Sequence, residues 1–540
     1  MTFNAVLTYR TKVKHNSIFI LAIPLALSAF THIWNPIGFP AIHPDEGTYM
    51  RRAMHSLEGL GAQDPSSQFD HTQFSTSSYD HPYFGQIFLA SVFQIIGYPD
   101  FSNLFANNDI QSIEILYMTP RILMGLLAVF DTFLVYKIAD RWYGNKIALV
   151  ASILFAVMPL SWLLRRILLD TIMLPLVLTS IYFMVSYVKK DSVYNYEHAK
   201  RNPTYKILLI LLSGIFLGLA VFTKLPAFSI IPLVGFLFFF NQSPTRTVRM
   251  FGLWLTPVIL IPLIWSAYAI SAGDFSEWLS GVLWQGSQRQ NEGKTLGDVV
   301  TIFLKLDPIL FFLGIAGIIF GAIKKDFFPV VWSAPYILLM YVVGWATHFH
   351  WILVLPVFCI AAALLLVRLS QLLLRIRNYR TVRLMPYIAI SAVSIFGLVS
   401  TTILVTSNLA LAQYQAAAFV SQEIHNGKYN PTVISSPIYS WIFKYVLDKD
   451  HVFAHIRDSS QPIQTKQILL IADATFHHVL SKVGEDKKQI QLIKTIYNNN
   501  TYPIASFRDT VIAYDTKNYP YINMREADIG GGQIIVQTNY

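Results

Sequence analysis

The sequence predicts an all-α polytopic membrane domain followed by a small α/β domain, and three observations carry this prediction. The 540-residue chain is 54% hydrophobic and 13% charged, a balance that excludes a set of soluble domains. Apolar runs long enough to cross a membrane recur as far as residue 407. From Gln413 the chain turns polar and rich in turn residues. We therefore expect a transmembrane domain at 1–411 and a second domain at 412–540.

Eleven apolar runs are candidate membrane spans, because each approaches the length needed to cross the hydrocarbon core. The first run follows Arg10, Lys12 and Lys14, which is the arrangement of a signal anchor. The predicted spans are 17–34, 120–139, 145–163, 171–188, 207–222, 226–241, 251–270, 308–323, 327–346, 350–367 and 386–407.

The formal charge of +10 is spread as short basic clusters between the spans and forms no single patch. This distribution indicates membrane orientation and no nucleic-acid partner. A cytoplasmic N-terminus makes every predicted inner loop basic. We therefore expect a multi-pass plasma-membrane protein whose loop at 35–119 and C-terminal domain are extracytoplasmic. The single cysteine, Cys359, permits no intramolecular disulfide.

The C-terminal domain shows the alternation of short β-like runs with one helix-like run, His477–Tyr497, that is typical of an α/β fold. The β-like runs are Thr432–Ser435, Gln467–Ala472, Val511–Tyr514 and Gln533–Gln537.

The loop at 35–119 begins with a predicted helix just outside the first span. Pro44 suits its first turn, and Gly59 and Gly61 suit its end. We expect one face to rest on the membrane surface, because it carries an apolar stripe of Met50, Met54 and Leu57.

The other face of this helix carries Asp45, Tyr49 and Arg52 at helical spacing. Asp45 and the adjacent Glu46 also suit a helix N-terminus for electrostatic reasons alone, since acidic residues there complement the macrodipole. A second start of the same kind, with His81, precedes the short apolar run 84–96, which we interpret as interfacial or re-entrant.

Ionisable residues also collect at the outer ends of the spans, where a basic bias is not expected. An outer pocket with carboxylates and cations suits transfer from a phosphate-linked donor: the cations hold the phosphate, and a carboxylate deprotonates the acceptor hydroxyl. Each residue also has a structural explanation, namely snorkelling for the cations and interface packing for the histidines. The residues are Arg121, Arg165, Arg166, Asp170, Lys224, His348 and His350.

Together these residues resemble a known family. An Asp-Glu pair followed by a Tyr in a long first outer loop, and then a His-Pro before an apolar run, is similar to the GT-C glycosyltransferases that use lipid-phosphate sugars, the protein O-mannosyltransferase and aminoarabinose-transferase group. Further matches lie at the outer ends of later spans: Arg121, Arg166-Ile-Leu-Leu-Asp170, Gly218-Leu-Ala-Val-Phe-Thr-Lys224 and His350-Trp-Ile-Leu-Val-Leu-Pro356.

This resemblance, over about residues 15–410, implies an inverting transfer of a sugar from a polyprenyl phosphate to an acceptor hydroxyl on a protein, glycan or lipid. Asp45 is the implied base, and Glu46 supports the acceptor or, with Asp45, a divalent cation such as Mg²⁺ or Mn²⁺. Arg165, Arg166, Lys224, His348 and His350 are the implied phosphate ligands. Tyr49, Arg52, His81 and Asp170 are expected to bind the acceptor or to support the site.

Two other functions fit the same architecture. A transporter or flippase is also polytopic, but such proteins usually carry charges near the midplane and inverted repeats. Here Asp131 is the one clear midplane charge, which we expect to pair with a polar group between helices, and no repeat is visible. The third alternative is a catalytically silent protein whose outer domain binds a partner.

Overall fold

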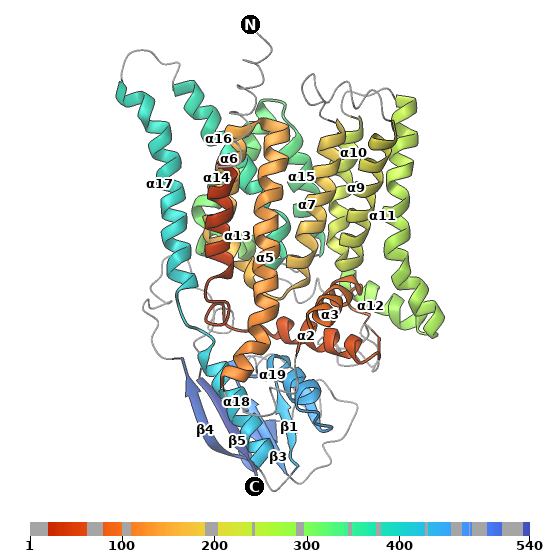
Figure 1. The fold of residues 1–540 in the computed structure, drawn as a ribbon, viewed down its shortest axis with the longest axis vertical. Coiled ribbons are helices and arrows are strands. Elements are labelled where there is room, and N and C mark those ends of the chain that lie inside the picture. Colours follow the sequence, from red (N-terminus) through yellow and green to blue (C-terminus); the bar gives the residue numbers. More distant parts are fainter. Residues whose placement is uncertain are drawn as a thin grey trace.

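The computed structural model describes residues 20–61, 79–99, 110–188, 203–239, 244–287, 296–343, 348–373, 380–426, 430–454, 467–474, 476–477, 494–509 and 533–540. They form a bundle of long helices with a small sheet below one end (Figure 1). We call this end of the bundle the sheet end. It also carries the short helices α2 (Pro44–Leu57) and α3 (Phe84–Ile96).

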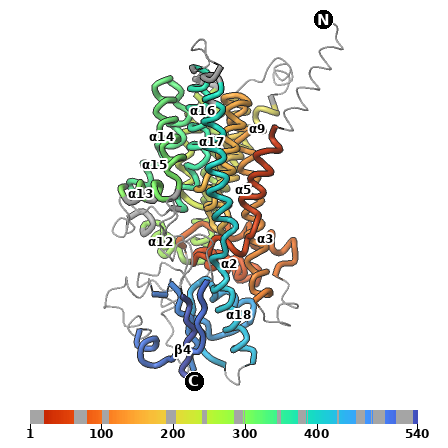
Figure 2. The backbone as a smooth tube through the Cα atoms, turned by 90° about the vertical axis from the view of Figure 1, so that its left-hand side faces the viewer, coloured from red at the N-terminus to blue at the C-terminus, as the bar shows by residue number. Residues whose placement is uncertain are grey.

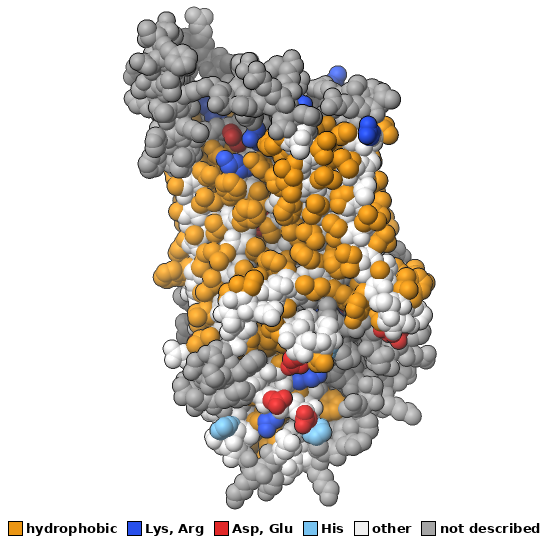
Figure 3. Space-filling view, turned by 45° about the vertical axis from the view of Figure 1, so that its right-hand side comes forward, with side chains coloured by type: hydrophobic (Ala, Val, Ile, Leu, Met, Phe, Trp, Pro, Cys, Tyr) orange, Lys and Arg blue, Asp and Glu red, His pale blue; other side chains and the backbone are white. Residues whose placement is uncertain are grey.

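Helices occupy all of the predicted spans, so the prediction of a multi-pass membrane protein is confirmed. Hydrophobic side chains cover the middle of the bundle, and charged side chains gather toward its ends (Figure 3). Among the described residues, six helices are long and apolar enough to cross a membrane: α5 (Ile110–Tyr143), α7 (Leu169–Val188), α9 (Pro203–Thr223), α11 (Pro244–Ala272), α16 (Leu355–Leu373) and α17 (Arg380–Val405). Shorter apolar helices fill four further spans: Ile20–Ile33, η2 (Leu225–Ile230) with α10 (Ile231–Phe239), α14 (Pro308–Ile323) and α15 (Phe328–Val343).

The predicted span 145–163 is not one straight helix. It consists of α6 (Asn145–Val157) and the 3₁₀ helix η1 (Pro159–Arg165), which meet at 66°. Proline lacks the amide hydrogen that an α-helix needs and disfavours helical backbone in the residue before it, so α6 ends where Pro159 begins. This break turns the chain inward at the sheet end and buries the two arginines that follow.

The C-terminal region is an α/β unit, as predicted. Its sheet has the order β2-β1-β3-β5-β4, with β1 parallel to β2 and β3, and β5 antiparallel to β3 and β4. The strands are β1 (Thr432–Ser435), β2 (Val452–Ala454), β3 (Ile468–Ala472), β4 (Tyr502–Arg508) and β5 (Gln533–Thr538). The sequence missed β2 and β4. The predicted strand Val511–Tyr514 and most of the predicted helix His477–Tyr497 lie outside the described residues.

The C-terminal region follows directly from the last span. Beyond α17 the chain continues through α18 (Leu411–Asn426), which starts at the predicted domain boundary, and on into the sheet (Figure 2). The short helix α19 (Pro437–Trp441) leads into a π-helical turn, η5 (Ile442–Val446), and a second such turn, η6 (Ile496–Asn500), precedes β4. Two further helices, α12 (Phe275–Ser287) and α13 (Leu296–Leu306), connect α11 to α14.

The apolar stripe of α2 does not rest on the membrane surface as expected. Met50 and Met54 are buried in the core that α2 shares with α19. Gly47 allows this close approach, because a Cβ at that position would lie 2.0 Å from the carbonyl oxygen of Pro437. The C-terminal region therefore packs directly on the helix that carries the Asp-Glu pair.

Candidate active site

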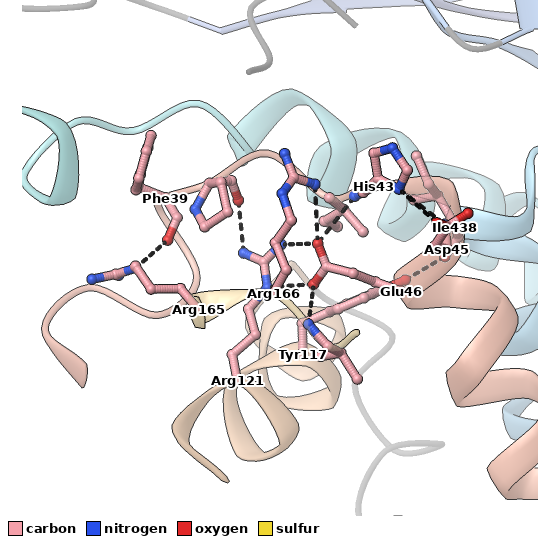
Figure 4. A network of polar contacts seen from close by, with 12 residues as sticks. Phe39, His43, Asp45, Glu46, Tyr117, Arg121, Arg165, Arg166 and Ile438 are labelled. Carbon is pink, nitrogen blue, oxygen red and sulfur yellow. Dashed lines mark hydrogen bonds and ion pairs between the residues drawn. The ribbon is translucent and has the colours of Figure 1, made fainter. Parts of the chain in front are cut away.

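The start of α2 sets two adjacent carboxylates in different surroundings. His43 caps the helix: its Nδ1 accepts the backbone N–H of Asp45 at 3.2 Å, and Glu46 Oε1 accepts the backbone N–H of His43 at 3.1 Å. This reciprocal arrangement is a capping box with histidine in place of serine or threonine. Glu46 thus turns back into the protein, while Asp45 lies on the other side of the helix start, next to His43 (Figure 4).

Glu46 is fully buried between two arginines. Arg121 on α5 donates from Nε and Nη2 to its two carboxylate oxygens, both at 3.0 Å, and Arg166 Nη1 lies 3.4 Å from Oε1. Burial acts to raise the pKa of Glu46, but the two guanidinium charges outweigh it and hold the pKa below its ordinary value. Arg121 also donates to the carbonyls of Pro36 and Pro40, so this ion-pair cluster fixes the chain leading into α2.

Asp45 keeps contact with solvent, since its side chain is 18% exposed, and its Oδ2 lies 3.8 Å from His43 Nδ1. By comparison, the side chains of Asp80 and Asp170 are 8% and 3% exposed. Asp45 is thus the most accessible of the acidic groups gathered here.

The remaining acidic residues of the site are each paired with a cation. Lys224, at the end of α9, places Nζ 2.6 Å from Asp170 Oδ2 at the start of α7. Arg52 on α2 places Nη2 2.9 Å from Asp80 Oδ1. Asp80 was not among the expected site residues, although it directly precedes His81, which was.

Tyr49 marks the centre of this group. Its ring lies 6.4 Å from that of His81. Burial raises the pKa of Tyr49 well above its ordinary value, and the nearby carboxylates of Asp45, Asp170 and Asp80 raise it further. Carboxylates from three separate segments therefore act on one phenol.

The other expected phosphate ligands have structural partners. Arg165 is buried and donates to four backbone carbonyls at the end of the first helix and beyond, at 2.5 to 3.2 Å: those of Thr31, Trp34, Asn35 and Phe39. These include helix-terminal carbonyls that lack partners within the helix. Arg166 lies on Glu46 and over the Trp162 ring at 5.2 Å.

The two histidines fall in η4 (His348–Leu353). His350 is buried, and its carbonyl accepts the hydroxyl of Tyr336. The side chain of His348 lies outside the described residues. The residue between them, which sequence reasoning missed, joins the site: the Phe349 ring lies 5.6 Å from the His43 ring and 5.7 Å from Lys224 Nζ.

The expected divalent cation does not fit the Asp45–Glu46 pair. Both oxygens of Glu46 already accept hydrogen bonds from Arg121, and Arg166 adds a second positive charge. Within the described part of the chain, no three His, Cys, Asp or Glu side chains come together as a metal-binding set.

Comparisons with known proteins place the chain beside membrane glycosyltransferases in sequence and fold. The family model for dolichyl-phosphate-mannose-protein mannosyltransferases matches residues 64–280, less than half of the chain. No curated protein matches the chain by sequence.

Solved structures match over a longer stretch. ArnT from Cupriavidus metallidurans in the apo state is 10% identical, with a TM-score of 0.56 and 98% of both chains covered; the form bound to undecaprenyl phosphate is 12% identical, with a TM-score of 0.53 and coverage of 97% of this chain and 98% of ArnT.

An Archaeoglobus fulgidus oligosaccharyltransferase tethered to an acceptor peptide is 12% identical, with a TM-score of 0.53 over 82% of this chain. The present chain spans 64% of that protein's length. The family match covers part of the chain, and the structural matches show a shared fold: the chain is a polytopic membrane protein with the GT-C fold.

Proposed function

We propose that this protein transfers a sugar from a polyprenyl-phosphate donor to an acceptor hydroxyl at the extracytoplasmic face of the plasma membrane, with Asp45 as the general base. The single observation that carries the proposal is the contrast among the carboxylates at the sheet end. Glu46, Asp80 and Asp170 are buried and paired with cations. Asp45, in contrast, is part-exposed and lies 3.8 Å from His43 Nδ1. A base must reach the substrate, and Asp45 is the group placed to do so.

The reaction is a single displacement. Asp45 takes the proton of the acceptor hydroxyl as the acceptor oxygen attacks the anomeric carbon. The bond between that carbon and the phosphate oxygen breaks, and the polyprenyl phosphate leaves with the electron pair. Attack from the face opposite the leaving group inverts the anomeric configuration.

Lys224 is the cation that we assign to the donor phosphate. Its Nζ lies in the same cluster as Asp45, and the Asp170 carboxylate holds it in place at 2.6 Å. A fixed ammonium stabilises the negative charge that develops on the leaving phosphate. Arg165 and Arg166 have a positioning role, because their hydrogen bonds hold the segments that carry Asp45 and Asp170.

The distribution of charge supports the proposed side of the membrane. Lys137, Arg141 and Lys146 lie where α5 ends and α6 begins, and Lys324 and Lys325 lie at the far end of α14. These clusters are at the end of the bundle opposite the sheet end (Figure 1). Basic loops favour the cytoplasmic side, so the sheet end is extracytoplasmic in this proposal.

The test uses purified wild-type protein and Asp45→Asn in nanodiscs, with radiolabelled polyprenyl-phosphate sugars and with membrane extract as the source of protein, glycan and lipid acceptors. We expect transfer by the wild type and a rate at least about 10²-fold lower in the variant, and anomeric analysis of the product tests inversion. The same assay with EDTA tests the divalent-cation expectation.

Equal transfer by both proteins would remove Asp45 as the base. If the wild type transferred no sugar from any donor of a broad panel, the transporter or the partner-binding alternative would be favoured. Circular dichroism of both proteins serves as the control for folding.

A further inference from the structure

Helix α12 carries a stripe of exposed apolar side chains. The chain turns out of α11 at Gly273, whose φ of 82° suits glycine. Phe275, Leu279 and Leu283 then follow at four-residue intervals, which places them on one side of α12. Their side chains are 44%, 40% and 58% exposed. A stripe of this kind needs an occupant, because large exposed apolar surfaces are costly in water.

The opposite side of α12 packs against the protein. The Trp278 ring lies 5.7 Å from that of Trp265 on α11. Gly281 lies against the backbone of Tyr79, because a Cβ on it would lie 2.4 Å from the Tyr79 carbonyl oxygen. The Tyr79 hydroxyl in turn donates to Asp274 Oδ2 at 3.1 Å. The orientation of α12 about its own axis is therefore fixed, with the stripe facing away from the protein.

The stripe continues a surface that already faces lipid. On the last turns of α11, Leu263, Ile264 and Ile270 are 50%, 53% and 61% exposed, and α11 is long and apolar enough to span a membrane. The apolar belt of the bundle reaches down to the sheet end (Figure 3), and α12 lies at that end, directly after α11 (Figure 1). A helix with one apolar face at the edge of such a belt has the features of an interfacial membrane helix.

We propose that α12 binds the lipid surface, with Phe275, Leu279 and Leu283 inserted among the acyl chains of the outer leaflet. The other face of α12 holds Tyr79, and the next residue, Asp80, is the ion-pair partner of Arg52 on α2. Lipid contact at α12 thus supports the segment that carries Asp80 to the candidate site. The effect on catalysis rests on the proposed function, whereas the lipid contact itself does not.

The test is fluorescence quenching by lipid in nanodiscs. The chain has one cysteine, Cys359, which is fully buried, so a cysteine introduced on the surface can be labelled selectively. Leu279→Cys is labelled with an environment-sensitive fluorophore, with Leu263→Cys on α11 as the lipid-facing control and Ile504→Cys on β4 as the exposed apolar control away from the belt. Wild-type protein taken through the same labelling is the blank.

We expect the label at 279 to emit at shorter wavelength and to be quenched by brominated lipids about as strongly as the label at 263, with little quenching at 504. A label at 279 that behaves like the one at 504 would overturn the proposal. Emission at short wavelength without quenching by lipid would also overturn it, in favour of a protein partner on the stripe. Neither readout depends on glycosyl transfer, so failure here is distinguishable from failure of the proposed function.

Discussion

The two sides of the α2 N-terminus differ in a way that separates stability from chemistry. On one side, Glu46 is fully buried and held by Arg121 and Arg166. On the other side, Asp45 is part-exposed and has His43 as its neighbour. The two residues are adjacent and chemically alike, yet one is held by ion pairs that fix the loop and the other is open to solvent. Among the described acidic groups of this site, Asp45 has the weakest pairing, and it is the one that we propose as the base.

Removing the charge on the open side has the largest expected effect on activity. Asp45→Asn should lower turnover by about 10²- to 10⁴-fold, the usual contribution of a general base, because an amide cannot take the acceptor proton. The free energy of unfolding should change by less than about 1 kcal/mol, since Asp45 is part-exposed and its contact with His43 Nδ1 is long, at 3.8 Å. Single-turnover transfer and a melting curve on one preparation measure both quantities. Retained turnover would argue for a different base.

Removing the charge of the buried Glu46 should affect stability instead. Glu46→Gln leaves Arg121 and Arg166 buried without their carboxylate, which costs on the order of 3–5 kcal/mol. The lowered pKa of Glu46 also gives a pH signature. The contribution of Glu46 to the free energy of unfolding is fully present at pH values above its ordinary pKa of 4.5. It is lost as the pH falls through the lower pKa of the folded state. Wild-type stability should therefore fall more steeply with acid than that of the variant; equal slopes would contradict the ion-pair assignment.

A substitution of Lys224 tests whether this residue binds the donor phosphate. Lys224→Ala should lower kcat/KM for the lipid donor by about 10- to 100-fold, since a charge-assisted contact to the phosphate is lost. The matched control is Asp170→Asn, which keeps the ammonium but loosens its position by removing the 2.6 Å ion pair. We expect a smaller loss in this control. Wild-type donor kinetics in Lys224→Ala would remove the phosphate assignment.

Gly47 tests the contact that joins α2 to the C-terminal region. Gly47→Ala places a methyl group 2.0 Å from the Pro437 carbonyl oxygen, an overlap that should cost about 1–3 kcal/mol. The control is Gly252→Ala within α11, where a Cβ meets nothing within 4 Å. Limited proteolysis should release C-terminal fragments faster from the first variant alone. Equal protection would show that α2 and α19 separate without cost.

Asp131 gives the smallest expected effect and bears on the transporter alternative. The expectation that it pairs between helices is wrong, because it is fully buried on α5 and neither carboxylate oxygen has a hydrogen-bond partner among the residues that the structure describes. Replacing this buried carboxyl with an apolar group should stabilise the fold. Asp131→Leu should therefore raise the free energy of unfolding by about 1 kcal/mol, seen as a higher melting temperature, with transfer unchanged. Loss of function in a stable variant would give Asp131 a functional role, for which the structure offers no account.

The sequence by itself determined the membrane architecture, the start of α2 and three of the described strands. Each depends on local features: the length of an apolar run, the fixed φ of Pro44, or alternation along a short strand. Tertiary structure decided which of two adjacent carboxylates is open, because the partners of Glu46 come from residues 121 and 166. It also turned the Met50 and Met54 stripe toward α19 and brought Phe349 beside His43. Local sequence carries no record of such contacts, since they depend on how distant helices pack together.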